Sequence, residues 1–203
     1  MLFVSVICNL YKDKDFSQYP ASDQWNQSWL DIKFRLKHLQ TLVESGIPLV
    51  LFAEPGILPE SFSQYKNLSI IWFTVDNLST YAKIMSINPV LPQNRNADKD
   101  TLSYFALMNS KLEFVSKAAE MYPEHTSYTW IDGSIFKLIT DNTSAYQKLH
   151  NFSKIDFTDA FTAPNGTYNK LQSGQSVIDI IWWRFLGGLF FIKTEYIHEF
   201  KQL

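Results

Sequence analysis

The chain has 203 residues, of which 46% are hydrophobic and 19% charged, a composition typical of globular proteins rather than disordered ones. The net charge of -2 argues against a broad nucleic-acid-binding surface, which needs clustered positive charge. A single cysteine, Cys8, excludes a disulfide framework and a cysteine-based zinc site. We expect one domain over residues 1–203, because a chain of this length can bury a sizeable core.

No segment is typical of a secretory signal or a membrane span. The N-terminal apolar run has no positive charge before it and no small-residue cleavage site after it. The longest apolar stretch, 177–192, is interrupted by charged residues and glycines, so no run reaches the ~18 residues of a membrane span. We therefore expect a cytoplasmic protein without a transmembrane segment.

Apolar runs typical of buried strands alternate with helical patterns along the chain. Strands are predicted at 2–8, 49–53 and 68–75, and again where SYTW runs into Asp132–Gly133. Helices are predicted at 29–43, 78–87, 101–121 and 194–203, whereas 88–100 is a loop and 141–176 is mixed and polar. This order predicts an α/β sheet, mostly parallel, with helices on both faces.

Ligands of such sheets bind at the carboxyl ends of the strands. Asn9, Asp76 and Asp132 each stand just past an apolar run. Asp132 is followed by Gly133 and Ser134, so a carboxylate, a close backbone approach and a hydroxyl coincide. This pattern fits a hard divalent cation that bridges phosphates, and it also fits a simple turn in which Asp132 caps the next helix.

Two further segments carry candidate binding residues. On the predicted helix 101–121, Asn109 falls on the apolar face, and Lys111 offers a cation to a phosphate or is a solvated surface lysine. Arg184 interrupts an apolar run before Gly187–Gly188. It is predicted either to bind a carboxylate or phosphate where the glycines admit a sugar, or to bridge a structural aspartate within a tight hairpin.

The common phosphate-binding and nucleophile motifs are absent from the sequence. It contains no G-x-G-x-x-G after the first strand, no P-loop and no G-x-S-x-G elbow. The four histidines show no H-x-x-x-H spacing. These observations argue against dinucleotide-binding, P-loop and serine-hydrolase functions.

The block KDTLSYFALMNSKLEFVSKAAEMYPEHTSYTWIDGSIFKLI (99–139) resembles the HtrL/YibB-like (WlaTC) family of glycosyltransferases. RFLGGLFFI (184–192) resembles a later segment of that family, and Cys8–Tyr11 fits its opening. The resemblance implies a GT-A-like (Rossmann-like) fold, a UDP- or GDP-linked sugar donor, a glycan or other hydroxyl acceptor, and Mn²⁺ or Mg²⁺.

The resemblance also implies roles for individual residues. Asp132 would bind the metal and diphosphate, although Ser134 stands where a D-x-D pair has its second carboxylate. The donor would contact Asn9, Tyr11 and Asp76 with its nucleoside, and Asn109, Lys111, Arg184, Gly187 and Gly188 with its diphosphate and sugar. Asp179 and Glu195 are the candidate catalytic bases, with Asp156 and Asp159 as further possibilities.

Three alternatives compete with a transferase. The first is a degenerate module that binds a nucleotide-sugar or a glycan without catalysis. The missing second carboxylate supports this alternative. The second is a hydrolase or phosphatase that uses Asp132 as nucleophile or metal ligand. The third is a structural partner protein that binds neither metal nor nucleotide.

Overall fold

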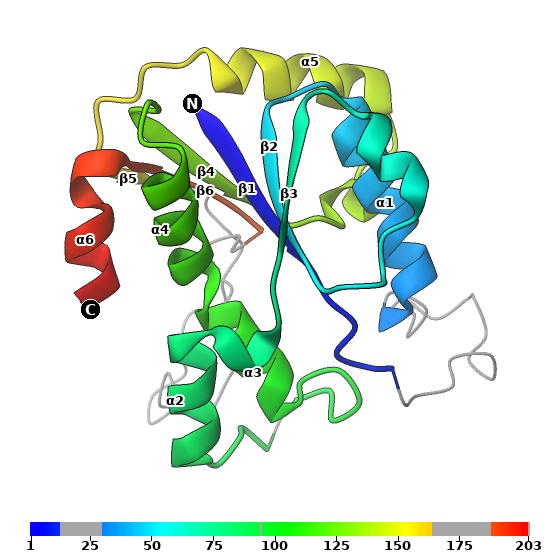
Figure 1. Ribbon diagram of the computed structural model, residues 1–203, viewed down its shortest axis with the longest axis vertical. Coiled ribbons are helices and arrows are strands. Elements are labelled where there is room, and N and C mark those ends of the chain that lie inside the picture. The colour runs from blue at the N-terminus through cyan, green and yellow to red at the C-terminus, as the bar shows by residue number, and fades with distance from the viewer. Residues whose placement is uncertain (13–29, 94, 164–187, 203) are drawn as a thin grey trace, which may run out of the picture.

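Six strands form one mixed, mostly parallel sheet in the order β3-β2-β1-β4-β6-β5 (Figure 1). The computed structural model describes residues 1–12, 30–93, 95–163 and 188–202. The four parallel strands are β1 (Leu2–Ile7), β2 (Leu49–Ala53), β3 (Leu68–Trp72) and β4 (Ser127–Ile131). Strand β6 (Leu189–Lys193) runs antiparallel to β4, and the short β5 (Phe161–Thr162) pairs with β6. The predicted α/β sheet is confirmed.

Helices cover both faces of the sheet, because alternate residues of its strands enter two different cores. On one face, Val4, Trp130 and their neighbours pack against α4 (Lys111–Met121) and α6 (Thr194–Gln202). On the other face, Phe3 and Ile131 pack with α1 (Ile32–Glu44), the short 3₁₀ helix η4 (Ile135–Leu138) and α5 (Asn142–Ser153). None of the helices in the described ranges has both the length and the apolar character needed to cross a bilayer.

The carboxyl ends of the parallel strands point toward two further helices, α2 (Ser79–Ile87) and α3 (Leu102–Asn109), which lie beyond the end of the sheet in Figure 1. Strand β3 ends at Trp72, earlier than the predicted 75, and the 3₁₀ helix η3 (Val75–Asn77) leads into α2. Two more connections are ordered: η2 (Glu60–Gln64) precedes β3, and α5 occupies the polar region 141–176 for which no helix was predicted.

The predicted single helix 101–121 is wrong, because the chain forms two helices that meet at Ser110. The Thr101 side chain caps α3 by accepting a hydrogen bond from the Tyr104 amide at 3.2 Å. Ser110 is buried, leaves helical geometry with ψ of 1°, and donates its hydroxyl hydrogen bond to the Ala106 carbonyl at 2.9 Å. Such a bond back to the preceding turn competes with regular helix geometry. The break makes Lys111 the first residue of α4.

Glu113 of α4 joins the sheet-covering layer to α2. Its two carboxylate oxygens accept hydrogen bonds, each 2.9 Å long, from the backbone amides of Ser79 and Thr80 in the first turn of α2. Burial alone would raise the pKa of Glu113. The amide hydrogen bonds and the nearby Lys117 ammonium outweigh it, so the net pKa lies below its ordinary value.

We predict that Glu113→Gln lowers the free energy of unfolding by roughly 1–2 kcal/mol at pH 7, because the charged cap of α2 is lost. A carboxylate with a lowered folded-state pKa stabilises the fold above its unfolded pKa, and this contribution disappears as pH falls through the folded value. The difference in the free energy of unfolding between the two proteins should therefore disappear below about pH 4. Urea unfolding measures it, with the exposed Glu60→Gln as control. A gap that stays constant down to pH 3 would contradict this account.

Candidate functional site

Asp132 stands at the carboxyl end of β4, where the sheet meets the layer that contains α3. Its side chain is 37% exposed and its Oδ1 atom accepts two hydrogen bonds, from Lys111 Nζ at 3.0 Å and from Trp130 Nε1 at 2.8 Å. The Lys111 ammonium also lies 5.3 Å from the centre of the Trp130 ring. The side chain of Asp132 does not act as a helix cap; it is the acceptor at the centre of a polar cluster.

Aromatic packing fixes the orientation of the Trp130 indole. Its side chain is 1% exposed and lies between Phe114 of α4 and Phe190 of β6, with ring centroids 6.1 and 6.3 Å away. Offset stacks of this kind hold aromatic rings in a defined plane. The indole N–H is thereby directed at Asp132, and the carboxylate position is set by the core below it.

Two glycines bring the backbone close to Asp132. A Cβ on Gly133 would lie 3.3 Å from Ser5 Oγ and 3.4 Å from the Val6 carbonyl oxygen, so Gly133 lets the chain pack against β1, not against a ligand. A Cβ on Gly188 would lie 3.1 Å from Asp132 Oδ2. The Asp132 amide donates to the Gly188 carbonyl at 2.8 Å. Gly188 therefore forms one wall of the carboxylate site.

Three more cations share the electrostatic environment of Asp132. Lys137 of η4 is half-buried, and burial lowers its pKa below the ordinary value. Asp132 opposes this effect, whereas Arg35, Lys99 and Lys111 add to it by repulsion. The carboxyl end of β4 is a concentration of positive charge around one carboxylate.

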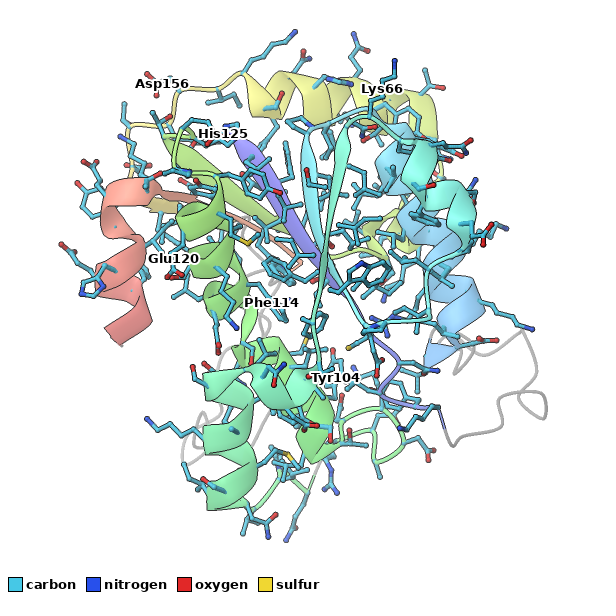
Figure 2. All side chains as sticks on the ribbon, viewed as in Figure 1. Lys66, Tyr104, Phe114, Glu120, His125 and Asp156 are labelled. Carbon is cyan, nitrogen blue, oxygen red and sulfur yellow. The ribbon has the colours of Figure 1, made fainter. Side chains whose placement is uncertain are left out.

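Lys99 and Arg35 are held at this end of the sheet by hydrogen bonds and, for Lys99, by an ion pair and an aromatic ring. The Tyr11 hydroxyl donates to the Lys99 carbonyl at 2.6 Å, and Lys99 Nζ lies 3.1 Å from Asp100 and 5.3 Å from the Tyr104 ring centre. Arg35 donates to the Cys8 carbonyl at 2.8 Å. Burial, with smaller contributions from Asp132 and Asp100, raises the pKa of Tyr104 to about 12. Tyr104 is labelled beyond the strand ends in Figure 2.

The structure gathers several of the sequence-predicted residues at this edge. Lys111, Asp132 and Gly188 are in direct contact. Asn9 and Tyr11 follow β1, the strand next to β4, and the Asn9 amide donates to Glu54 Oε2 at 2.9 Å. Ser134 is half-buried at the start of η4, two residues past Asp132. Burial raises the pKa of the Cys8 thiol to about 12, as expected of an inert buried cysteine.

Three other predicted site residues make no hydrogen bond or ion pair with Asp132 in the described part of the chain. Asn109 is exposed and donates to the Phe105 carbonyl of its own helix at 2.8 Å, so its predicted place on the apolar face is wrong. Asp76 is exposed in η3, and the carbonyl of the next residue, Asn77, accepts a hydrogen bond from Lys117 of α4 at 3.4 Å. Glu195 begins α6 at the opposite edge, since the adjacent Thr194 amide binds the Thr126 carbonyl that precedes β4.

Asp179, Arg184 and Gly187 lie outside the described residues. The further candidate bases Asp156 and Asp159 are exposed, and Figure 2 places Asp156 at the edge of the sheet opposite Tyr104. That edge also contains a cavity of about 740 Å³ lined by Thr126, Asp156 and Glu195 among others. An apolar cavity of about 430 Å³ lies under α5, next to the residues that flank Asp132.

Sequence reasoning missed three residues near this site, Arg35, Tyr104 and Lys137. It also missed that the Trp130 indole holds the Asp132 carboxylate in place. Only Arg35 carried a usable signal. It lies near the N-terminus of α1, where a cation opposes the helix dipole, and that position is at the carboxyl edge because α1 connects the parallel strands β1 and β2. Lys137 sits in a single 3₁₀ turn without periodicity, so nothing in the local pattern distinguishes it from a surface lysine.

The side chains that the structure describes at this site are poorly suited to bind a divalent cation in the absence of another ligand. Asp132 Oδ1 already accepts from an ammonium group and an indole, and an incoming metal ion would be repelled by the cations around it. A ligand that supplies its own negative charge suits the donor set better. Asp132 and Ser134 stay the predicted metal ligands on the strength of the sequence pattern and the resemblance.

No protein-family model matches this chain, and a search of curated proteins finds no match. The assignment to the HtrL/YibB-like family therefore remains a resemblance, carried by the residues of 99–139 and 184–192.

We predict that Gly188→Ala costs about 1 kcal/mol of folding free energy, because the new methyl group pushes the Asp132 carboxylate away from its partners. The cost should shrink by at least ~0.5 kcal/mol in an Asp132→Ala background, where no carboxylate opposes the methyl group. Urea unfolding of the two single variants and the double variant measures this coupling. Strict additivity would show that Gly188 does not form a wall of the carboxylate site.

Proposed function

We propose that this protein binds a nucleoside-diphosphate sugar at the carboxyl edge of its sheet and transfers the sugar to an acceptor hydroxyl. The observation that carries the proposal is the half-exposed Asp132 carboxylate within a cluster of cations, at the strand ends where α/β sheets bind ligands. A diphosphate is a polyanion that such a cluster attracts, and a carboxylate among cations supplies an acceptor for a sugar hydroxyl.

The order of elements along the edge supports a GT-A-like arrangement. The loop after β1, with Asn9 and Tyr11, lies next to β4, so a nucleoside there would extend its diphosphate toward Asp132. Lys111 would contact the phosphates, and Gly188, which packs against the Asp132 carboxylate, would line the site on the sugar side. Asp76 is exposed in η3, and its contact with the nucleoside stays a prediction.

The proposed reaction exchanges one bond at the anomeric carbon for another. The bond between that carbon and the phosphate oxygen breaks, its electron pair stays on the leaving diphosphate, and the acceptor oxygen forms the new bond. Fixed cations around the leaving group stabilise the charge that develops on it. The acceptor proton passes to a base. Asp179 remains the predicted base, whereas Glu195 lies at the other edge of the sheet.

The resemblance also adds Mn²⁺ or Mg²⁺, and this part stays a prediction. A divalent cation would supply further charge neutralisation of the diphosphate when bound. It would reach the site more readily as part of a metal–diphosphate complex, because the phosphate oxygens offset the repulsion from the surrounding cations.

A second candidate function is a nucleotide-sugar or glycan binding module without catalysis. Ser134 stands at the position of the second carboxylate, and Lys111 already neutralises the first. These two features would preserve anion binding while weakening metal-assisted chemistry. Donor binding without release of nucleoside diphosphate would identify this module.

We predict that Asp132→Ala lowers donor turnover at least ~100-fold while leaving the fold intact, because the acceptor for Lys111 and the sugar is removed. Release of nucleoside diphosphate from UDP- and GDP-sugars measures turnover, with and without Mn²⁺. Circular dichroism checks the fold, and the exposed Glu199→Gln is the matched control. Equal turnover in Asp132→Ala would remove Asp132 from the reaction.

We also predict that Glu195→Gln keeps turnover within about twofold of the parent protein, because Glu195 lies at the opposite edge of the sheet from Asp132. The same release assay applies across pH 5–9. A loss of turnover together with a flattened pH profile would identify Glu195 as the base and contradict this placement.

A further inference from the structure

Trp130 and Asp132 occupy neighbouring positions on one face of the sheet at the end of β4. Side chains two residues apart on a strand point to the same side of the sheet. Asp132 follows the last residue of β4, and its amide binds the Gly188 carbonyl at 2.8 Å, so the pairing with the β6 segment extends to it. The indole N–H therefore reaches the Asp132 carboxylate, and the distance from Nε1 to Oδ1 is 2.8 Å.

The two oxygens of the Asp132 carboxylate have different surroundings. Oδ1 accepts hydrogen bonds from Trp130 Nε1 at 2.8 Å and from Lys111 Nζ at 3.0 Å. Oδ2 lies beside the Gly188 backbone, where a Cβ would be 3.1 Å away, and accepts no hydrogen bond from the residues that the structure describes. The side chain as a whole is 37% exposed. Since each carboxylate oxygen can accept about two hydrogen bonds, Oδ2 is the oxygen with the capacity to bind a ligand.

A row of stacked aromatic rings holds the Trp130 indole in place. Trp130 is 1% exposed, and its ring lies 6.1 Å from the ring of Phe114 (labelled in Figure 2) and 6.3 Å from that of Phe190, at interplanar angles of 30° and 14°. The row continues from Phe190 through Phe161 of β5 to Phe200 of α6, with ring centroids 5.5 and 5.2 Å apart. Rotation of the indole would disturb this packed layer, so its N–H donor is held in one direction.

We infer that Trp130 is a positioning residue for the proposed sugar transfer. Its indole N–H and the Lys111 ammonium group fix Oδ1, so that Asp132 presents Oδ2 to a hydroxyl of the donor sugar. This inference rests on the proposed function and deepens it. Because Trp130 is 1% exposed, it acts through the carboxylate and not through contact with the donor. Loss of a buried partner that orients a functional group typically lowers activity roughly 10- to 100-fold.

Trp130→Phe tests this role, because phenylalanine keeps an aromatic ring between Phe114 and Phe190 and removes the N–H donor. We expect kcat for release of nucleoside diphosphate to fall about tenfold while the donor KM changes less than about twofold. In an Asp132→Ala background the same change should lower kcat less than about twofold, because no carboxylate remains to be positioned. Trp72→Phe, at a tryptophan that is 55% exposed, is the matched control and should leave kcat unchanged.

Urea unfolding measures the hydrogen bond without any donor. We expect the effects of Trp130→Phe and Asp132→Ala on the folding equilibrium constant to depart from independence by at least ~3-fold. If Trp130→Phe fails to fold, 3-benzothienylalanine at this position replaces it, since the analogue keeps the shape of the indole and has sulfur in place of the N–H. The loss of kcat expected of the analogue is again about tenfold.

The outcomes separate this inference from the proposed function. Equal loss of kcat in the parent and Asp132→Ala backgrounds overturns the inference and leaves the transferase in place, because Trp130 then acts only through general stability. Unchanged kcat in Trp130→Phe, or independent effects of the two substitutions in urea, overturns it as well. If the parent protein turns over no donor while the two substitutions stay coupled in urea, the transferase is contradicted, and the role of Trp130 in transfer falls with it.

Discussion

The ion pair between Lys111 and Asp132 is the interaction on which the candidate site depends. It links the first turn of α4 to the end of β4, and the indole of Trp130 donates to the same oxygen. The pair is only partly buried, so its net contribution to stability is modest. Its main consequence is positional: it places a lysine ammonium group at the strand ends, where ligands of α/β sheets bind.

The position of Lys111 in turn depends on the break between α3 and α4. A continuous helix over 101–121 would carry Lys111 in mid-helix. The buried Ser110 instead ends α3, and α4 begins at the strand ends. Glu113 then ties α4 to α2 through two backbone amides. The layer beyond the strand ends is thus connected to the sheet by polar contacts from one short helix, which also carries Lys111.

Positive charge around a single carboxylate is the main electrostatic feature of this edge. Burial is the main cause of the lowered pKa of Lys137, and repulsion from Arg35, Lys99 and Lys111 adds to it. The same positive charge favours a polyanionic ligand over an isolated metal ion. Nucleotide-sugar transfer requires charge neutralisation of a leaving diphosphate, and fixed side chains provide it without reorganisation at the moment of reaction. The same arrangement would serve a binding module, and turnover distinguishes the two.

The sequence by itself determined the α/β class, the mostly parallel sheet and the position of Asp132 at the end of a strand, because buried strands and the polar residues that end them leave local patterns. It misplaced Asn109 on the apolar face of its helix. Only the tertiary structure decided that Arg35, Lys99 and Lys137 lie at the same end of the sheet as Lys111, and that Glu195 lies at the opposite end of β4. The physical reason is that convergence of distant segments depends on strand order and helix packing, which no spacing along the chain encodes.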